Sequence, residues 1–506
     1  MKQKRLFKTF SSVTGIIIIS KIFGFLKQMV TASAFGATIE TDIISLSQGF
    51  IANLEYLLAQ TMVTAFIPIY IHAKAESLEK GNRLVSDTAK LFAVIAGALA
   101  VIMTVFAYWI AKILAPTYPA ELSAQLMRYI RIFSPILVLY ILMAVFRALL
   151  NANERFIPGE LIGINQSVIL IFMVLIFGET LGVQTLVLSF FAYNIWNFLF
   201  LGGSSRSYWK ISVGNPMRNK DIRRMLQMMG PLLFGYSMIY VNQQVDKILV
   251  SGLPAGTVTA MNYGAVLSNL VATFIGTFCS ILFTYITKNI SIGENRAAAL
   301  LTTRAAAILI ALFLPVSIIT VLCAEDIVTI VFGRGAFGGN AVTGAALALM
   351  GYGFSFVPLV MRELFSRFQY GYQDSKWPTI NSTIGIGFNI IFSVILCRRF
   401  GVLGVTFASS VSVLICGALN AISAKRHNTF LHFRPILRQI PLWTAGSAVC
   451  ILICKMGLLR LAEATALLRF LLTACCGGGG YFLVTGYAIY RLFQQRATVN
   501  VMDEIK

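Results

Sequence analysis

The sequence predicts an all-α, polytopic membrane protein with about fourteen transmembrane helices. Hydrophobic residues make up 57% of the 506 positions and charged residues only 12%, and the mean hydropathy is +0.78. A soluble protein could not bury this much apolar side chain. The apolar runs are continuous over about 20 residues, the length that a helix needs to cross a bilayer. Strands of a membrane β-barrel would instead alternate apolar and polar residues.

Each predicted helix is one such run, and polar, glycine-containing or proline-containing segments separate the runs. The fourteen helices are predicted near residues 9–33, 43–72, 88–114, 124–150, 158–178, 181–203, 228–252, 258–288, 297–323, 340–369, 376–397, 402–424, 438–457 and 465–491. Between the ninth and tenth helices, residues 324–340 have an interrupted apolar pattern. We expect an interfacial loop with a short helix there.

The formal net charge of +21 follows from basic residues that stand between the apolar runs. They gather before the first helix, after the second, between the sixth and seventh, and between the twelfth and thirteenth. These four segments fall on one side of the membrane, which the positive-inside rule assigns to the cytoplasm. We therefore expect both termini in the cytoplasm, membrane lipids as partners, and no nucleic acid as a partner.

The longest basic connection divides the chain. We expect an N-terminal six-helix lobe at 1–203, a basic cytoplasmic linker at 204–227, a C-terminal six-helix lobe at 228–424, and two additional helices with a cytoplasmic tail at 425–506. This division predicts two lobes around a central cavity, with the last two helices outside them.

The two lobes are predicted to be internal repeats. A single offset of 220 residues places Arg147 on Arg367 and Pro158 on Pro378. Six helices separate the matched elements, so they have the same orientation in the membrane. Such a parallel repeat has its axis along the membrane normal and could rock about a cavity at the midplane.

The first helix carries an unusual polar face. At about 100° per residue, six polar or small residues fall within an arc of about 120°: Ser20, Lys21, Gly24, Lys27, Gln28 and Thr31. A charge at membrane depth costs about 3 kcal/mol or more, so such residues usually face a bundle interior or a wet cavity. The alternative is that both lysines reach the nearest interface along their aliphatic stems. Lys21 fits that alternative poorly, because it lies well inside the apolar run.

Further polar residues lie in the second and seventh helices, which are the other candidates for lining the cavity. They are Asp42, Asn53 and Glu55 in or before the second helix, and Gln243 and Asp246 in the seventh. We predict that these five residues and Lys21, Lys27 and Gln28 form a substrate-binding site. Arg362 and Glu363 are adjacent in the tenth helix, so we expect their side chains to point apart.

The sequence lacks the patterns of the common enzymes. It has no GxxxxGK[ST] loop for a nucleotide phosphate, no GxSxG or HExxH motif, and no cysteine spacing typical of a metal site. We therefore expect a transporter rather than an enzyme, with no cofactor, no metal site and no hydrolysis of ATP.

Several short motifs resemble one family in order and spacing over nearly the whole chain. They are Ser20–Phe25 with Lys27, Phe35-Gly36-Ala37, Thr41-Asp42, Ala65–Pro68, Gly230-Pro231, Asn262-Tyr263-Gly264, and Tyr372–Lys376 with Pro378. In these motifs the chain resembles the MurJ/MviN family of lipid II flippases, which belongs to the multidrug/oligosaccharidyl-lipid/polysaccharide exporter superfamily.

The resemblance implies a protein of the bacterial cytoplasmic (inner) membrane that works by alternating access. It implies two six-helix lobes, a cationic cavity and a groove for a lipid tail on the last two helices. The membrane potential or a coupling ion would drive the cycle. Its partners would be a lipid-linked oligosaccharide and membrane lipids.

Members of the family hold the diphosphate of the substrate with arginines in the first, second and eighth helices. The matching first-helix positions here are Lys21 and Lys27, and the aspartate that opens the second helix is Asp42. The second-helix arginine position is Glu55, and the eighth-helix pair falls at Ala265-Val266. Lysine keeps the positive charge but loses the bidentate geometry of arginine.

The sequence thus favours a flippase for an undecaprenyl-diphosphate sugar of the lipid II type, used in peptidoglycan synthesis and hence in cell-wall and cell-shape maintenance. One alternative is a flippase for exopolysaccharide or O-antigen repeat units. Another is a cation-coupled multidrug exporter, in which the acidic side chains would bind organic cations. A membrane scaffold without transport is a further alternative.

Overall fold

The computed structural model describes residues 2–210 and 215–503, and most side chains between residues 15 and 490. Every regular element in that part of the chain is a helix, so the predicted all-α fold class is confirmed. Ten of the described helices are long and apolar enough to cross a membrane, or up to twelve if each of two bent pairs is one span. This number is consistent with the fourteen predicted spans. Residues 211–214 of the predicted linker and 504–506 of the tail lie outside the described residues.

The chain divides into two compact units. The first contains Met1–Thr259 and Arg334–Phe337, and the second contains Ala260–Gly333 and Gly338–Lys506. The division falls near the start of α10, one helix after the basic connection at which the sequence suggested a boundary.

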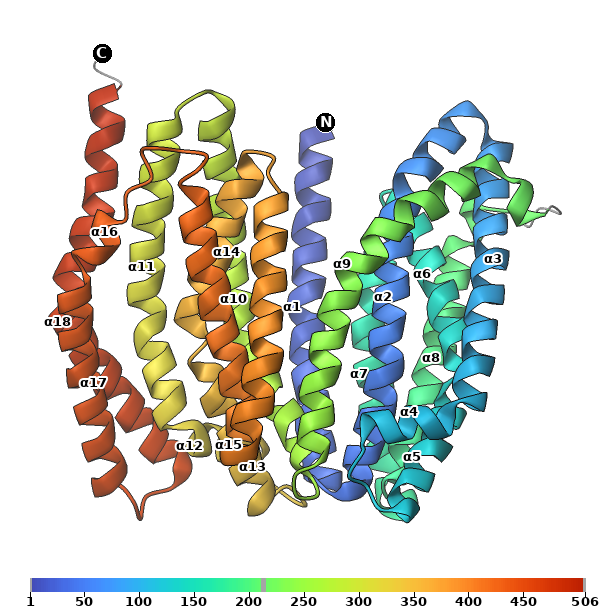
Figure 1. The fold of residues 1–506 in the computed structure, drawn as a ribbon, viewed down its shortest axis with the longest axis horizontal. Coiled ribbons are helices and arrows are strands. Elements are labelled where there is room, and N and C mark those ends of the chain that lie inside the picture. The colour runs from blue at the N-terminus through green and yellow to red at the C-terminus, as the bar shows by residue number, and fades with distance from the viewer. Residues whose placement is uncertain (1, 211–214, 504–506) are drawn as a thin grey trace. The chain divides into compact units, whose positions relative to one another are not determined.

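The first unit is built around α2, which packs against α3, α5, α6 and α9, while α7 lies between α1 and α8 (Figure 1). Its helices are α1 (Lys2–Phe35), α2 (Ile39–Glu76), α3 (Leu78–Val105), α4 (Ala107–Leu114), α5 (Ala120–Phe133), α6 (Ile136–Ala152), α7 (Ile157–Leu181), α8 (Gln184–Ser205) and α9 (Lys220–Ser251), with short 3-10 turns at Arg206–Tyr208 and Pro216–Arg218. The core contains the buried rings of Phe66, Tyr70, Phe92 and Phe133.

The second unit is built around α11, which packs against α13, α14, α17 and α18. Its helices are α10 (Thr257–Ser291), α11 (Asn295–Leu322), α12 (Ala324–Phe332), α13 (Asn340–Gly353), α14 (Phe356–Gly371), α15 (Lys376–Ala424), α16 (Arg434–Leu437), α17 (Ile440–Arg460) and α18 (Ala466–Asp503). The helix α12 is the short helix expected in the segment 324–340.

The helix α15 is a hairpin of the two predicted helices 376–397 and 402–424. Gly401 has a non-helical backbone, with φ 58° and ψ −134°. On either side of it, Asn381 bonds to Asn420 and Asn389 bonds to Ser409. The bonded residues are closer together in sequence the nearer they lie to Gly401, so the two arms run antiparallel.

The predicted repeat is visible in the element bounds. The pair α5 and α6 begins at 120 and 136, and the pair α13 and α14 begins at 340 and 356, which is the offset of 220 residues. The bends between the paired helices are 41° and 44°. Gly182, between α7 and α8, has φ 54° and ψ −138°, which matches the backbone of Gly401.

Proline explains both bends, which the sequence did not predict within the runs 124–150 and 340–369. A proline has no N–H for the carbonyl four residues earlier. Pro135 therefore cannot donate to the carbonyl of Arg131, and the hydroxyl of Ser134 donates to that carbonyl instead, at 3.1 Å. Pro358 likewise offers no N–H to the carbonyl of Phe354, at the break before α14.

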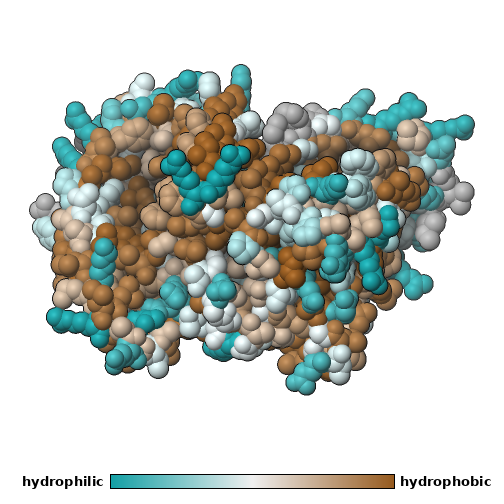
Figure 2. Space-filling model, turned by 60° about the horizontal axis from the view of Figure 1, so that its bottom comes forward, coloured by the Kyte–Doolittle hydropathy of each residue, from teal (hydrophilic) through white to brown (hydrophobic). Residues whose placement is uncertain are grey.

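Apolar side chains cover much of the visible surface in Figure 2. Large apolar side chains are exposed on several helices; Leu175 on α7, Leu459 on α17 and Leu483 on α18 are 73%, 78% and 88% exposed. Exposed apolar surface of this extent is typical of contact with lipid rather than with water. The chain is therefore a multi-pass membrane protein.

The last long helix is fastened to the second unit by an ion pair. Asp326 of α12 is 2% exposed and accepts bonds from Nε of Arg469 on α18 at 2.8 and 3.0 Å, with a further contact from Nη2. The helices α17 and α18 pack closely where Gly477 meets Cys454. A Cβ at Gly477 would lie 2.5 Å from Sγ of Cys454, so only glycine fits there without a shift.

Candidate functional site

The polar arc predicted in the first helix lies on one uninterrupted helix, α1. Lys21 is exposed, and Lys27 and Gln28 are half-buried. One edge of the arc touches α7, because a Cβ at Gly163 would collide with Oγ of Ser20. At Gly24, in the middle of the arc, a Cβ would meet no atom within 4 Å. The centre of the arc therefore borders open space.

The two lysines of this arc have no acidic partner among the side chains that the structure describes. Among the described side chains, neither Lys21 nor Lys27 takes part in an ion pair. An unpaired cation in a membrane-spanning segment is stabilised by water or by an anion. The face can thus attract a negatively charged group.

The candidates Asn53 and Glu55 lie on α2, where both are half-buried. Nδ2 of Asn53 is buried and has no hydrogen-bond partner among the described residues. Glu55 is attracted by the guanidinium of Arg147 on α6, which also pairs with Glu160 of α7 at 3.2 Å. Glu55 is thus part of a network of charges within the first unit.

The helix α9, which packs against α2, holds two more candidates. Gln243 is exposed and Asp246 is half-buried. The adjacent Gln244 is 7% exposed, and neither Oε1 nor Nε2 has a partner among the described residues. Nζ of Lys247 lies 2.6 Å from the place that a Cβ at Gly49 of α2 would take. Glycine at position 49 therefore makes room for this lysine.

Sequence reasoning missed Gln244 as a candidate. A buried amide without a partner costs about 1–3 kcal/mol, and such groups in native proteins usually mark a ligand or a bound water. The chain has Gln243 and Gln244 side by side, so only the rotation of α9 decides which of the two is buried.

Asp42 has a different environment from the other candidates. It is 2% exposed, and its carboxylate accepts hydrogen bonds from the backbone N–H groups of Gly256 and Thr259, each at 2.7 Å. These groups lie at the start of α10, where N–H groups have no partner within the helix. Burial, with the negative charge of Asp42, raises the pKa of nearby Tyr118. In this conformation Asp42 caps α10.

Together, the eight predicted residues lie on α1, α2 and α9 of the first unit. The structure brings Asn53 and Glu55 onto a helix that packs against the one with Gln243 and Asp246. It sets Lys21, Lys27 and Gln28 on α1, which packs against α7, and gives Asp42 a capping role. Binding of a substrate by these residues stays a prediction.

In the second unit, one expectation about charged neighbours is wrong. Nη2 of Arg362 bonds to Oε1 of Glu363 at 2.8 Å, although the two residues are adjacent in α14. Nη2 of Arg367 reaches the other oxygen of Glu363 at 3.1 Å. Their long side chains bend toward each other because one carboxylate can serve two guanidinium groups.

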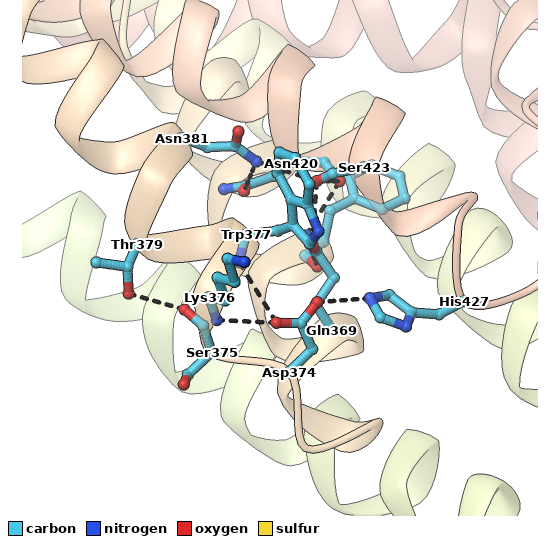
Figure 3. A network of polar contacts seen from close by, with 11 residues as sticks. Gln369, Asp374, Ser375, Lys376, Trp377, Thr379, Asn381, Asn420, Ser423 and His427 are labelled. Atoms are coloured by element: carbon cyan, nitrogen blue, oxygen red, sulfur yellow. Dashed lines mark hydrogen bonds and ion pairs between the residues drawn. The ribbon is translucent and has the colours of Figure 1, made fainter.

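The motif Tyr372–Lys376 forms the turn between α14 and α15 (Figure 3). Oδ1 of Asp374 accepts the N–H of Lys376 at 2.8 Å, and Oδ2 lies 2.7 Å from Nε2 of His427. Burial alone would raise the pKa of Asp374, but these bonds and the N–H of Trp377 outweigh it and hold that pKa below its usual value.

Above this turn, neutral side chains join α14 to both arms of α15. Nδ2 of Asn381 bonds to Oδ1 of Asn420 at 2.8 Å and to Oγ of Ser423 at 3.0 Å, and Ser423 bonds to Gln369 (Figure 3). All four side chains are buried and have partners within the network, so it fixes helix packing rather than offering a binding site.

Comparison with known sequences gives one family over most of the chain. The family model described as "Lipid II flippase MurJ" matches residues 31–472. A probable lipid II flippase MurJ of Borreliella burgdorferi is 24% identical over 413 residues, which are 78% of this chain and 79% of that protein. The lipid II flippase MurJ of Burkholderia cenocepacia is 24% identical over 75% of this chain and 76% of its own.

Solved structures agree in fold. The structure titled "Lipid II flippase MurJ, inward closed conformation" has a TM-score of 0.80 and 19% sequence identity, covering 95% of this chain and 99% of that one. An inward-facing multidrug resistance MATE family transporter of the MOP superfamily has a TM-score of 0.61 and 13% identity, covering 81% of this chain and 95% of that one.

Proposed function

Because the chain belongs to the MurJ lipid II flippase family, we propose that its substrate is lipid II or a closely related undecaprenyl-diphosphate glycan. Membership of this family makes the protein a transporter of a lipid-linked cell-envelope precursor, and not an enzyme. The observation that carries the proposal is the match of the family model to residues 31–472.

The polar face of α1 supports a role for Lys21 and Lys27 in binding the diphosphate. Both lysines lack an acidic partner among the described side chains, and Gly24 between them borders open space. Two cations beside a diphosphate reduce the energy needed to take the anion away from water. Gln28, Asn53, Gln243 and the buried Gln244 would bond to phosphate or sugar oxygens.

The transport cycle would be alternating access, with the head group in a central cavity and the polyprenyl tail in lipid along α17 and α18. The basic connections support an orientation with both termini in the cytoplasm of a bacterial cell, in its inner membrane. Moving one net charge through 100 mV is worth about 2.3 kcal/mol. The membrane potential or a coupling ion could thus bias the cycle.

The acidic candidates have separate roles in this scheme. Glu55 and Asp246 would modulate the charge of the cavity as the substrate binds. Asp42 would act on the substrate indirectly, through the position of α10. These roles fit the structure, in which Glu55 is attracted by Arg147 and Asp42 caps α10.

Complementation tests the identity of the substrate. The gene is expressed in a bacterial strain depleted of its own lipid II flippase, and insertion of the protein into the membrane is checked. Growth and normal cell shape are expected if lipid II is transported. A stably inserted protein that gives no rescue would contradict lipid II as the substrate. It would favour the second candidate, an exopolysaccharide repeat-unit flippase. The lysines at positions where the family has arginines support that candidate.

A further inference from the structure

One face of α10 carries a row of polar side chains outside the predicted substrate-binding site. Its members are Asn269, Thr273, Thr277, Ser280 and Thr284, all of them exposed. Steps of three and four residues place them within an arc of about 80°. The row from Thr273 to Thr284 extends about 16 Å along the helix.

The hydroxyl groups of this row have the same local geometry. Each donates its hydrogen to the backbone carbonyl four residues earlier, at 2.7 Å for Thr273, 2.8 Å for Thr277 and Ser280, and 3.5 Å for Thr284. The oxygen lone pairs remain available outside the helix. The face is therefore a row of acceptors for hydrogen-bond donors.

A charged group from another helix lies at this row. Nη1 of Arg367 on α14 contacts Oγ of Ser280. A hydroxyl bonded to its own helix is tolerated in lipid, but a guanidinium in a membrane-spanning segment usually faces a wet cavity or a protein interior. Thr277 and Thr284 lie within about one turn of Ser280 on the same face of α10.

Arg367 belongs to a cluster with Arg362 and Glu363, in which the positive charges outnumber the negative ones. Glu363 serves both Arg362 and Arg367, at 2.8 and 3.1 Å, so two guanidinium groups face one carboxylate. The cluster keeps one net positive charge beside a row of neutral acceptors. This combination suits a ligand that offers hydroxyl and amide N–H donors to the row and an oxygen acceptor or a carboxylate to Arg367.

We propose that the row on α10, with Arg367, binds the glycan part of the head group of the lipid-linked substrate. Sugar hydroxyls and N-acetyl N–H groups donate to the oxygens of Thr273, Thr277 and Thr284, and Arg367 donates to sugar oxygens or to a carboxylate. The inference rests on the proposed function and adds to it the site that reads the glycan. A diphosphate fits this row poorly, because its oxygens are themselves acceptors.

The test compares two lipids in detergent-solubilised full-length protein by native mass spectrometry: lipid II and undecaprenyl diphosphate, which has no glycan. The variant is Thr277→Val/Thr284→Val, which keeps side-chain shape and removes two acceptors. The matched control is Thr343→Val/Thr383→Val, whose threonines are exposed and make the same bond four residues back. A second variant, Thr277→Ser/Thr284→Ser, restores the hydroxyls.

We expect the valine variant to bind lipid II about tenfold more weakly, as for two neutral hydrogen bonds, and undecaprenyl diphosphate as the wild type does. The serine variant and the control should match the wild type for both lipids. Unchanged affinity for lipid II, or an equal loss for both lipids, overturns the inference alone. If the wild type binds neither lipid, the proposed function fails, and the inference fails with it.

Discussion

Replacing Asp42 with asparagine tests how the start of α10 is held. The carboxylate accepts two backbone N–H groups at 2.7 Å, from Gly256 and Thr259. Asparagine keeps one acceptor oxygen, but its amide nitrogen can only face the second N–H as another donor. The variant also removes a negative charge from the positive end of the helix dipole.

The magnitude follows from these two losses. A hydrogen bond to a charged group contributes about 1.5–3 kcal/mol, and the remaining bond weakens when its acceptor becomes neutral. Because Asp42 is 2% exposed, water cannot replace the lost bond. We expect the free energy of local opening at Gly256 and Thr259 to fall by about 2–3 kcal/mol. This corresponds to a loss of roughly 30- to 150-fold in amide protection.

Hydrogen exchange with mass spectrometry measures this effect on a peptide that spans the start of α10. Glu40→Gln is the matched control, since Glu40 lies in the same first turn of α2 but is exposed. Its protection should equal that of the wild type. Equal protection of this peptide in Asp42→Asn and wild type would refute the capping role.

Three further substitutions test other contacts. Arg469→Ala leaves the buried carboxylate of Asp326 unpaired and should lower the free energy of unfolding by about 3–5 kcal/mol, read as a fall in the melting temperature; Arg469→Lys should recover only part of it. Gln244→Met replaces a buried amide without a partner, so the melting temperature should stay equal or rise while lipid II binding weakens; a large fall in stability would contradict an unpartnered amide. The pKa of Asp374 is below its unfolded value near 4, so the stabilising effect of its carboxylate is present at neutral pH and lost as pH falls through the folded pKa. In Asp374→Asn the melting temperature should therefore depend less on pH between about pH 5 and 3. The same pH dependence in the variant and the wild type would contradict this role.

Most helix positions follow closely from the sequence, because continuous apolar runs leave few choices for a backbone in lipid. The run predicted as one helix at 88–114 is an exception, since it begins at Leu78 and is divided into α3 and α4 at Phe106. The repeat offset seen at Arg147 and Arg367 recurs in the bounds of α5 and α13. The bends did not follow, although Pro135 and Pro358 could have indicated them. A proline inside an apolar run can end a helix, kink it or be accommodated, and packing decides among these.

The candidate site was less predictable than the fold. Helical spacing predicted the polar face of α1, because that face depends only on the angular positions of residues around a single helix. The buried state of Gln244 and the bonds of Asp42 depend on contacts between helices that are far apart in sequence. The pairing of Arg362 with Glu363 depends on side-chain flexibility, which spacing along a helix does not capture.

Translocation of lipid II across reconstituted vesicles tests the central claim most directly. The wild type is compared with Lys21→Ala/Lys27→Ala and with Lys112→Ala, a control that removes an exposed lysine of α4. Head groups that reach the far leaflet are counted by a membrane-impermeant enzyme or quencher. We predict transport by the wild type and the control, loss of most of it in the double alanine variant, and recovery in Lys21→Arg/Lys27→Arg. Wild-type rates in the double alanine variant would contradict the claim that the cationic face of α1 carries the diphosphate.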